Sequence, residues 1–213
     1  LRSSAASDVY KRQEKMITPI AEQILAHGKA QWLEFCPPTY VSSDISHLQT
    51  VAKEQGGDWV LKPLAGSYGR DVHYVTSREQ QLIGEIMQTR SGSYFALQRF
   101  VPAIIHGEIR TLVAGGKIIG SYRRQPLTGI RANLAAEGHA TPVLDQDLDT
   151  DLINKVLADL QRRRIGYAAI DTVGGYLMEV NLANPGGLGT LCTIYQSDLG
   201  EQVVGAVASQ HGL

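Results

Sequence analysis

The chain has 213 residues, a formal net charge of -1 and 43% hydrophobic residues, enough for one sizeable core or two small ones. The near-neutral balance, without a basic stripe, argues against a nucleic-acid partner. No apolar run approaches the ~18 residues that cross a bilayer, so no membrane partner is expected. Cys36 and Cys192 form no C-x-x-C pair, which argues against a disulfide framework and favours a cytoplasmic protein.

The first twelve residues, Leu1 to Arg12, show no helix cap and no apolar period that continues into the next segment. They resemble a translated sequencing adaptor. We therefore expect residues 1–12 to be a non-native or disordered leader that is not part of the fold. On this interpretation the natural protein is expected to continue further upstream.

In the first half of the chain, apolar spacing predicts alternating helices and strands. Ser43 or Asp44 can cap the second helix, Gly56-Gly57 can end it, and Pro63 ends the strand that follows. The predicted elements are a helix over 14–27, an extended run over 39–41, a helix from 45, a buried strand over 59–62, a glycine-bearing loop over 64–71, a strand over 72–75, a helix over 77–89 and a strand over 94–101.

The second half is richer in strands. Gly115-Gly116-Lys117 and Gly174-Gly175 each separate two apolar runs, which predicts two hairpins. The further predictions are a mobile loop over 124–141, a helix from Asp149 or Thr150 to Arg164, and a final helix over 197–209. The pattern indicates a mixed α+β fold in two lobes, with a waist near 102–107.

The candidate metal ligands lie in the second predicted hairpin. Glu179 and Asn181 are two residues apart in one strand, so they share a face. A three-residue turn, Gly174-Gly175-Tyr176, would place Asp171 opposite Glu179 on that face, whereas a two-residue turn would not. Three oxygen-bearing side chains suit Mg²⁺. A solvated outer face of an edge hairpin is the alternative.

Lys62 ends a hydrophobic strand and precedes the loop Gly66-Ser67-Tyr68-Gly69. Backbone N–H groups of such a loop can approach a phosphate, and the lysine adds a point charge. The loop is not a Walker A motif, because no G-x-x-x-x-G-K-[ST] occurs. An ordinary strand-ending lysine before a turn is the alternative.

Two other functions fit less well. Ala65 to Gly69 superficially matches the nucleophile elbow of a serine hydrolase, but a strand is predicted after it where a helix is needed. The acidic run from Asp145 to Asp151 hints at a calcium loop, but Thr150 stands where glycine is required and Val156 where glutamate is required.

Taken together and in order, these motifs resemble those of prokaryotic glutathione synthetases, which are ATP-grasp ligases. The resemblance rests on WVLKPLAGSYGRDV, LQRFVPAIIHGEIR, RANLAAEG and AAIDTVGGYLMEVNLANPGG, and it covers the chain from about Glu14 to Gly187. It implies an α+β ATP-grasp fold, with one subdomain over 13–101, a second over 102–213, and the loop 124–141 as a lid.

The resemblance also implies roles for individual residues. Two Mg²⁺ ions, for which Mn²⁺ can substitute, would be held by Asp171, Glu179 and Asn181. The phosphates of ATP would contact Lys15, Lys62 and the loop residues Gly66, Ser67 and Gly69. Adenine would meet the backbone of Arg99, Phe100 and Val101, and ribose would meet Glu108. Catalysis would involve Arg110, Arg124 and Asn133, and the substrate pocket would be lined by Asn184, Pro185, Gly186 and Gly187.

The implied reaction is ATP-dependent ligation of a carboxylic acid to an amine, with γ-glutamylcysteine and glycine as the expected substrates and ADP and phosphate released. The alternatives are an ATP-grasp ligase for another amino-acid or peptide substrate and a non-catalytic ATP-binding module. The family carries an additional N-terminal domain, expected here as a missing part of the same protein. Whether the protein forms a homo-oligomer is left open.

Overall fold

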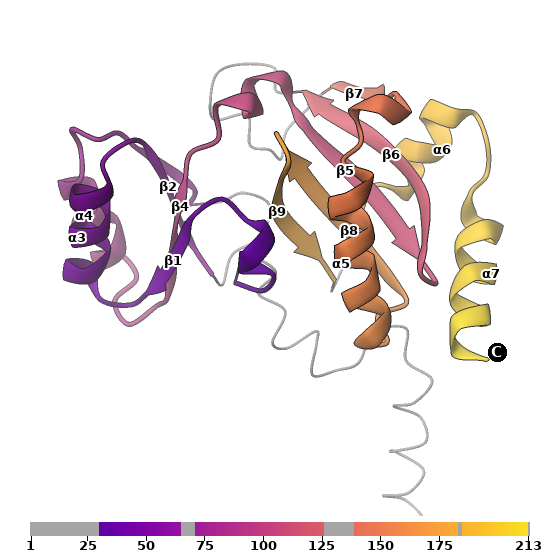
Figure 1. The fold of residues 1–213 in the computed structure, drawn as a ribbon, viewed down its shortest axis with the longest axis horizontal. Helices are drawn as coiled ribbons and strands as arrows, with labels where there is room; N and C mark the ends of the chain where they lie inside the picture. Colours follow the sequence, from indigo (N-terminus) through magenta and orange to yellow (C-terminus); the bar gives the residue numbers. More distant parts are fainter. Residues whose placement is uncertain (1–29, 65–70, 126–138, 183–184, 213) are drawn as a thin grey trace, which may run out of the picture.

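The computed structural model describes residues 30–64, 71–125, 139–182 and 185–212 of the chain. These residues form two lobes, each built on one antiparallel sheet, and Figure 1 shows them side by side. The mixed α+β prediction is confirmed. The predicted helix over 14–27 lies outside the described residues.

The small lobe has a four-stranded sheet in the order β1-β4-β2-β3. Two helices, α3 (Ile45–Gln55) and α4 (Gln81–Gln88), cover the side of this sheet that faces away from the large lobe (Figure 1). Asp44 caps α3 through its side chain, as predicted. The strands are β1 (Thr39–Ser42), β2 (Trp59–Pro63), β3 (His73–Val75) and β4 (Phe95–Arg99).

Strand alternation gives the small sheet two different faces. Alternate residues of β2 and β4, including Trp59, Leu61 and Leu97, join the core that α3 and α4 cover. Lys62 follows Leu61 and Gln98 follows Leu97, so both side chains point to the opposite face of the sheet. The polar face of this sheet is the one that looks toward the large lobe.

The large lobe has a five-stranded sheet in the order β7-β6-β5-β8-β9. Helix α5 (Thr150–Arg162) packs on one face, and α6 (Leu188–Tyr195) and α7 (Gly200–His211) cover part of the other. The strands are β5 (Glu108–Ala114), β6 (Lys117–Gln125), β7 (His139–Pro142), β8 (Tyr167–Val173) and β9 (Tyr176–Asn181).

Two segments join the lobes. The short helix η2 (Pro102–His106) occupies the predicted waist. The second segment contains η1 (Leu33–Phe35), which lies between the two lobes in Figure 1. Trp32 at its start donates to Asp159 of α5 at 2.6 Å, while Arg99 donates its backbone N–H to Pro38.

The two hairpins of the large sheet share one backbone plan. Gly115-Gly116 and Gly174-Gly175 each form a two-residue turn with both residues at positive φ, where glycine is favoured. Of the two turn lengths left open by the sequence, the turn therefore has the shorter one. Asp171 nevertheless lies opposite Glu179, because a β-bulge at Met178 inserts one extra residue after the turn.

Several predicted boundaries also need correction. The loop over 124–141 is too long, since β6 reaches Gln125 and β7 begins at His139; residues 126–138 lie outside the described part. The helix over 77–89 is shorter, and the final helix runs from Gly200 to His211. Helices α6 and η3 (Asp145–Asp147) were not predicted. No helix among the described residues is long and apolar enough to cross a membrane.

Candidate active site

Asp171 is the centre of a polar network on the large sheet. It is 2% exposed and lies in β8, a central strand, so the alternative of a solvated outer hairpin face is wrong for this residue. Arg110, which lies directly opposite on β5, donates its Nε to Oδ1 at 2.8 Å and its Nη2 to Oδ2 at 2.7 Å. This two-point contact fixes both side chains.

Oδ2 of Asp171 accepts two more hydrogen bonds. Arg124 donates its Nη2 at 3.0 Å, and Asn181 donates its Nδ2 at 3.1 Å. Because the nitrogen of the Asn181 amide is committed to Asp171, its oxygen is the atom left to ligate a cation. Glu179 lies opposite Asp171 in the sheet register. The three predicted metal ligands thus come together at one place.

The two arginines are used differently. Arg110 donates with all three of its nitrogens, because its Nη1 also contacts the Gly186 carbonyl at 3.2 Å. Burial lowers the pKa of Arg110, but the hydrogen bond to Asp171 and its negative charge outweigh burial and raise the pKa overall. The guanidinium therefore stays charged and ties Asp171 to the segment around Gly186.

Glu108, for which a ribose contact was predicted, belongs to the same polar network. It is buried, lies opposite Arg124 across β5 and β6, and forms an ion pair with that residue. Burial raises the pKa of Glu108 to about 7, the charge of Asp171 adds to the rise, and Arg124 and Arg110 oppose it.

Lys62 lies on the polar face of the small sheet. It is only 8% exposed, and its Nζ donates to Oε1 of Gln98 at 3.0 Å. Gln98 in turn donates to the Thr39 hydroxyl, which donates to the Pro37 carbonyl. Gln98 was missed from the sequence; its signal is its place in the alternation of β4, on the face that Lys62 shares.

The hinge between the lobes contains Arg99, Phe100 and Val101. The backbone N–H groups of Arg99 and Phe100 donate to the Pro38 and Asp58 carbonyls at 2.8 and 3.0 Å. These two groups are therefore committed to the fold. Of the three predicted adenine contacts, Val101 is the residue whose N–H is left to meet a base.

The remaining predicted residues fall into two groups. Pro185, Gly186 and Gly187 are described, and Gly187 sits against Tyr122: a Cβ there would lie 2.5 Å from the Tyr122 hydroxyl. The other group lies outside the described residues, namely Lys15, Gly66, Ser67, Gly69, Asn133 and Asn184.

The donor set fits Mg²⁺. Asp171, Glu179 and Asn181 offer only oxygen ligands, which a hard cation prefers. Among the described residues, no group of three or more His, Cys, Asp or Glu side chains could hold a metal by itself. Mg²⁺ commonly binds one or two carboxylates together with phosphate oxygens and water, so two carboxylates and an amide can suffice on the protein side.

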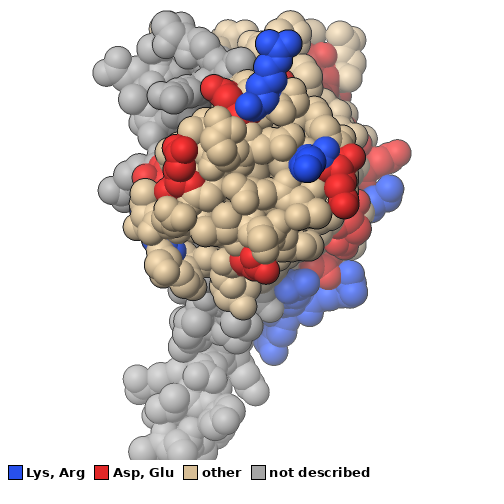
Figure 2. Space-filling view, turned by 90° about the vertical axis from the view of Figure 1, so that its left-hand side faces the viewer, with Lys and Arg blue, Asp and Glu red and all other residues tan. Residues whose placement is uncertain are grey.

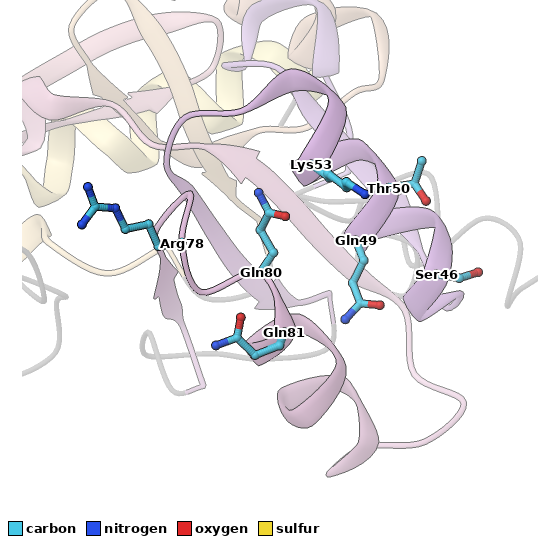
Figure 3. A pocket seen from close by; sticks show the side chains of 7 residues that line it. All are labelled: Ser46, Gln49, Thr50, Lys53, Arg78, Gln80 and Gln81. Carbon is cyan, nitrogen blue, oxygen red and sulfur yellow. The ribbon is translucent and has the colours of Figure 1, made fainter.

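A hollow of about 410 Å³ lies elsewhere, between α3 and the start of α4. Figure 3 shows the uncharged polar side chains that dominate it, with Lys53 and Arg78 beside them. It opens on the side of the small lobe away from the sheet, where Figure 2 shows a largely uncharged surface with charges toward its edges. The hollow shares no residue with the Asp171 network. We place the candidate site at that network because the carboxylates and arginines converge there.

Comparisons with known proteins concern the chain as a whole. Residues 25–196 match the model of the family described as "Prokaryotic glutathione synthetase, ATP-grasp domain". The glutathione synthetase of Neisseria meningitidis serogroup B (strain MC58) is 31% identical over 180 residues, which is 82% of this chain and 56% of that protein. The chain thus spans little more than half the length of this relative.

Two solved structures share the fold. D-cycloserine synthetase DcsG has a TM-score of 0.70 at 16% identity, covering 92% of this chain and 73% of DcsG. D-alanine–D-alanine ligase from Bacillus anthracis, solved with ATP, has a TM-score of 0.62 at 16% identity, covering 92% of this chain and 70% of the ligase. At such low identity, the likeness concerns the fold alone.

Proposed function

This chain belongs to the prokaryotic glutathione synthetase ATP-grasp family, and on that premise we propose that it is the nucleotide-binding part of an ATP-dependent carboxylate–amine ligase. The proposed acid is γ-glutamylcysteine, the amine is glycine, and ADP and phosphate are released. The observation that carries the proposal is the convergence of Asp171, Glu179 and Asn181 with two arginines on one face of the large sheet.

The chemistry explains why such a network is useful. A carboxylate is a poor acyl donor until one oxygen becomes a phosphate leaving group. Phosphoryl transfer requires in-line positioning and positive charge near the equatorial oxygens more than covalent help from the protein. The amine must then reach the acylphosphate before water does. A buried carboxylate with two arginines and further oxygen ligands on one face of the large sheet would meet these needs.

We assign the described residues to separate tasks. Asp171, Glu179 and Asn181 would hold Mg²⁺, which shields the charge of the β- and γ-phosphates. Lys62 would contact a phosphate from the small lobe, and Val101 would offer its N–H to adenine. Arg110 and Arg124 would neutralise the phosphoryl group, and Pro185 to Gly187 would line the substrate pocket. The roles of the residues outside the described part stay predictions.

Two further proposals concern the whole protein. Because the chain spans 56% of the Neisseria relative, we propose that the rest of the protein, including an N-terminal domain, completes the peptide-substrate site. The cytoplasm is the proposed location, since both substrates and ATP are small intracellular molecules.

The test is Mg²⁺-dependent ATP binding measured by titration calorimetry. Wild-type protein should bind ATP with Mg²⁺ and weakly without it, and Asp171→Asn and Glu179→Gln should each weaken binding at least ~10-fold. Asp151→Asn, an exposed carboxylate at the start of α5, is the matched control and should bind normally. Equal binding by all four proteins, or none by folded wild type, would reject the proposal.

A further inference from the structure

Glu108 and Arg124 meet because the backbone brings their strands close. The two residues face each other at the ends of β5 and β6 and form an ion pair. Gly107 precedes Glu108 with φ +90, and a Cβ there would lie 2.6 Å from the Arg124 carbonyl oxygen. Only glycine permits this approach. The close approach of the two backbones, as well as the opposite charges, therefore brings Glu108 and Arg124 together.

Arg124 is held through a single nitrogen. Its Nη2 has two hydrogens, and it contacts both Glu108 and Oδ2 of Asp171. Its Nε is buried and has no hydrogen-bond partner among the described residues. Arg110, by contrast, uses all three nitrogens internally. A buried N–H without a partner is costly, so Arg124 has unmet donor capacity beside the metal ligands.

We propose that Glu108 is a positioning residue that, together with Asp171, holds Arg124 by one nitrogen and leaves its other donors for the oxygens of the transferred phosphoryl group. The proposal rests on the function proposed above. It replaces the ribose role predicted for Glu108, because that carboxylate is buried and already paired with Arg124. Arg124 contacts the phosphoryl group in this scheme, and Glu108 acts only through it.

The two roles of Glu108 predict different binding behaviour, which can be measured without the amine or acid substrate. Aluminium fluoride bound beside Mg·ADP mimics the phosphoryl group during its transfer. Calorimetry gives the affinity for ADP with and without aluminium fluoride. A positioning residue affects only the fluoride-dependent tightening. A ribose-binding residue affects ADP itself, and affects 2′-deoxyADP less because the 2′-hydroxyl is missing.

The experiment compares wild type, Glu108→Gln, Glu108→Ala, Arg124→Ala and the Glu108→Ala/Arg124→Ala double variant, each checked for folding by circular dichroism. We expect the tightening to fall at least ~10-fold in both alanine variants, as for a lost charge-stabilising donor, and ADP affinity to change less than ~3-fold. The double variant should be no worse than Arg124→Ala, since one residue acts through the other. Glu108→Gln, which keeps the size and an acceptor, should retain part of the tightening.

Three outcomes would overturn the inference. These are weaker binding of ADP but not of 2′-deoxyADP by Glu108→Ala, additive losses in the double variant, and wild-type binding of ADP with no fluoride-dependent tightening. All three leave the proposed nucleotide site standing. If folded wild type binds no nucleotide, the proposed function fails and the inference fails with it.

Discussion

The hairpins β5–β6 and β8–β9 have the same backbone and opposite uses. In each, a residue three positions before a Gly-Gly turn pairs with the residue four positions after it, and a bulge adds one residue between: Ile119 in the first hairpin and Met178 in the second. In β5–β6 the pair is Leu112 and Gly120, which lies under Leu191 of α6. In β8–β9 it is Asp171 and Glu179.

The comparison shows that backbone geometry sets where a site can be, while side chains decide whether the place is used for packing or chemistry. Leu112 is fully buried in an apolar cluster with Leu191. Asp171 is almost equally buried but is surrounded by two guanidiniums and an amide. A buried carboxylate persists only where such partners compensate its charge.

The largest expected effect comes from making the second hairpin resemble the first. Asp171→Leu removes a buried carboxylate that pairs with two partly buried arginines, so we expect a loss of about 3–5 kcal/mol in unfolding free energy. Mg·ATP affinity should fall at least ~100-fold, or about 2.7 kcal/mol. Denaturant unfolding and calorimetry measure the two changes.

The matched control is Leu112→Ala in the first hairpin. It should cost about 2–5 kcal/mol of stability through the cavity that it leaves, yet the folded protein should bind Mg·ATP normally. If Leu112→Ala weakened ATP binding as much as Asp171→Leu does, the division between a packing hairpin and a chemical hairpin would be wrong.

The second prediction concerns the turns. Gly115 has φ +54, and a Cβ there would lie 2.0 Å from the Ala206 carbonyl oxygen of α7. Gly175 has φ +82, and its nearest neighbour would be a side-chain oxygen of Asp149 at 3.8 Å. Gly175→Ala should therefore cost only the left-handed strain of about 1–2 kcal/mol.

Gly115→Ala should cost more, about 3 kcal/mol, because α7 must also move. Thermal or urea unfolding of the two variants checks the order. Similar stabilities would mean that α7 yields easily, and the β5–β6 hairpin would then be less firmly packed than its contacts indicate.

The Asp171–Glu179 pairing also shows what the sequence can and cannot predict. The Gly-Gly pairs and the flanking apolar runs were enough to predict both hairpins, and the polar residues at Glu179 and Asn181 indicated the site. The sequence left the turn length open, and a regular two-residue hairpin would have placed Asp171 opposite Met178. A bulge leaves no clear mark in the residue types, since Leu177 and Met178 are both apolar.

Helix α6 was missed for a related reason. Its N-cap is Gly187 at φ +121, with no side-chain cap, and only Leu191 of its residues is buried. Helices of eight residues depend on tertiary packing more than on intrinsic propensity. The ion pair of Glu108 with Arg124 was likewise invisible, because it depends on the strand register between β5 and β6.

The third prediction tests the bulge directly. Deleting Met178 should convert β8–β9 into a regular two-residue hairpin, in which Asp171 still faces Glu179 and Leu177 and Val180 still face α5. We expect Mg·ATP affinity within about threefold of wild type, as for Met178→Ala, which keeps the bulge. Loss of binding by the folded deletion variant, but not by Met178→Ala, would show that the bulge also shapes the site.

The smallest effect concerns two segments that pack on the large sheet and each carry a cysteine. Cys36 packs with Val180 and Leu182 against the β8–β9 side of the core, whereas Cys192 lies on α6 and is only half-buried. Burial raises the pKa of Cys36 to about 11, with Lys62 opposing the shift and Glu34 adding to it, so its reactive thiolate is scarce at pH 8. Iodoacetamide followed by mass spectrometry should label Cys192 first and Cys36 only after denaturation. Equal labelling in the native protein would mean that the segment around Cys36 does not stay packed on the large lobe, and that β8–β9 is the less securely covered hairpin.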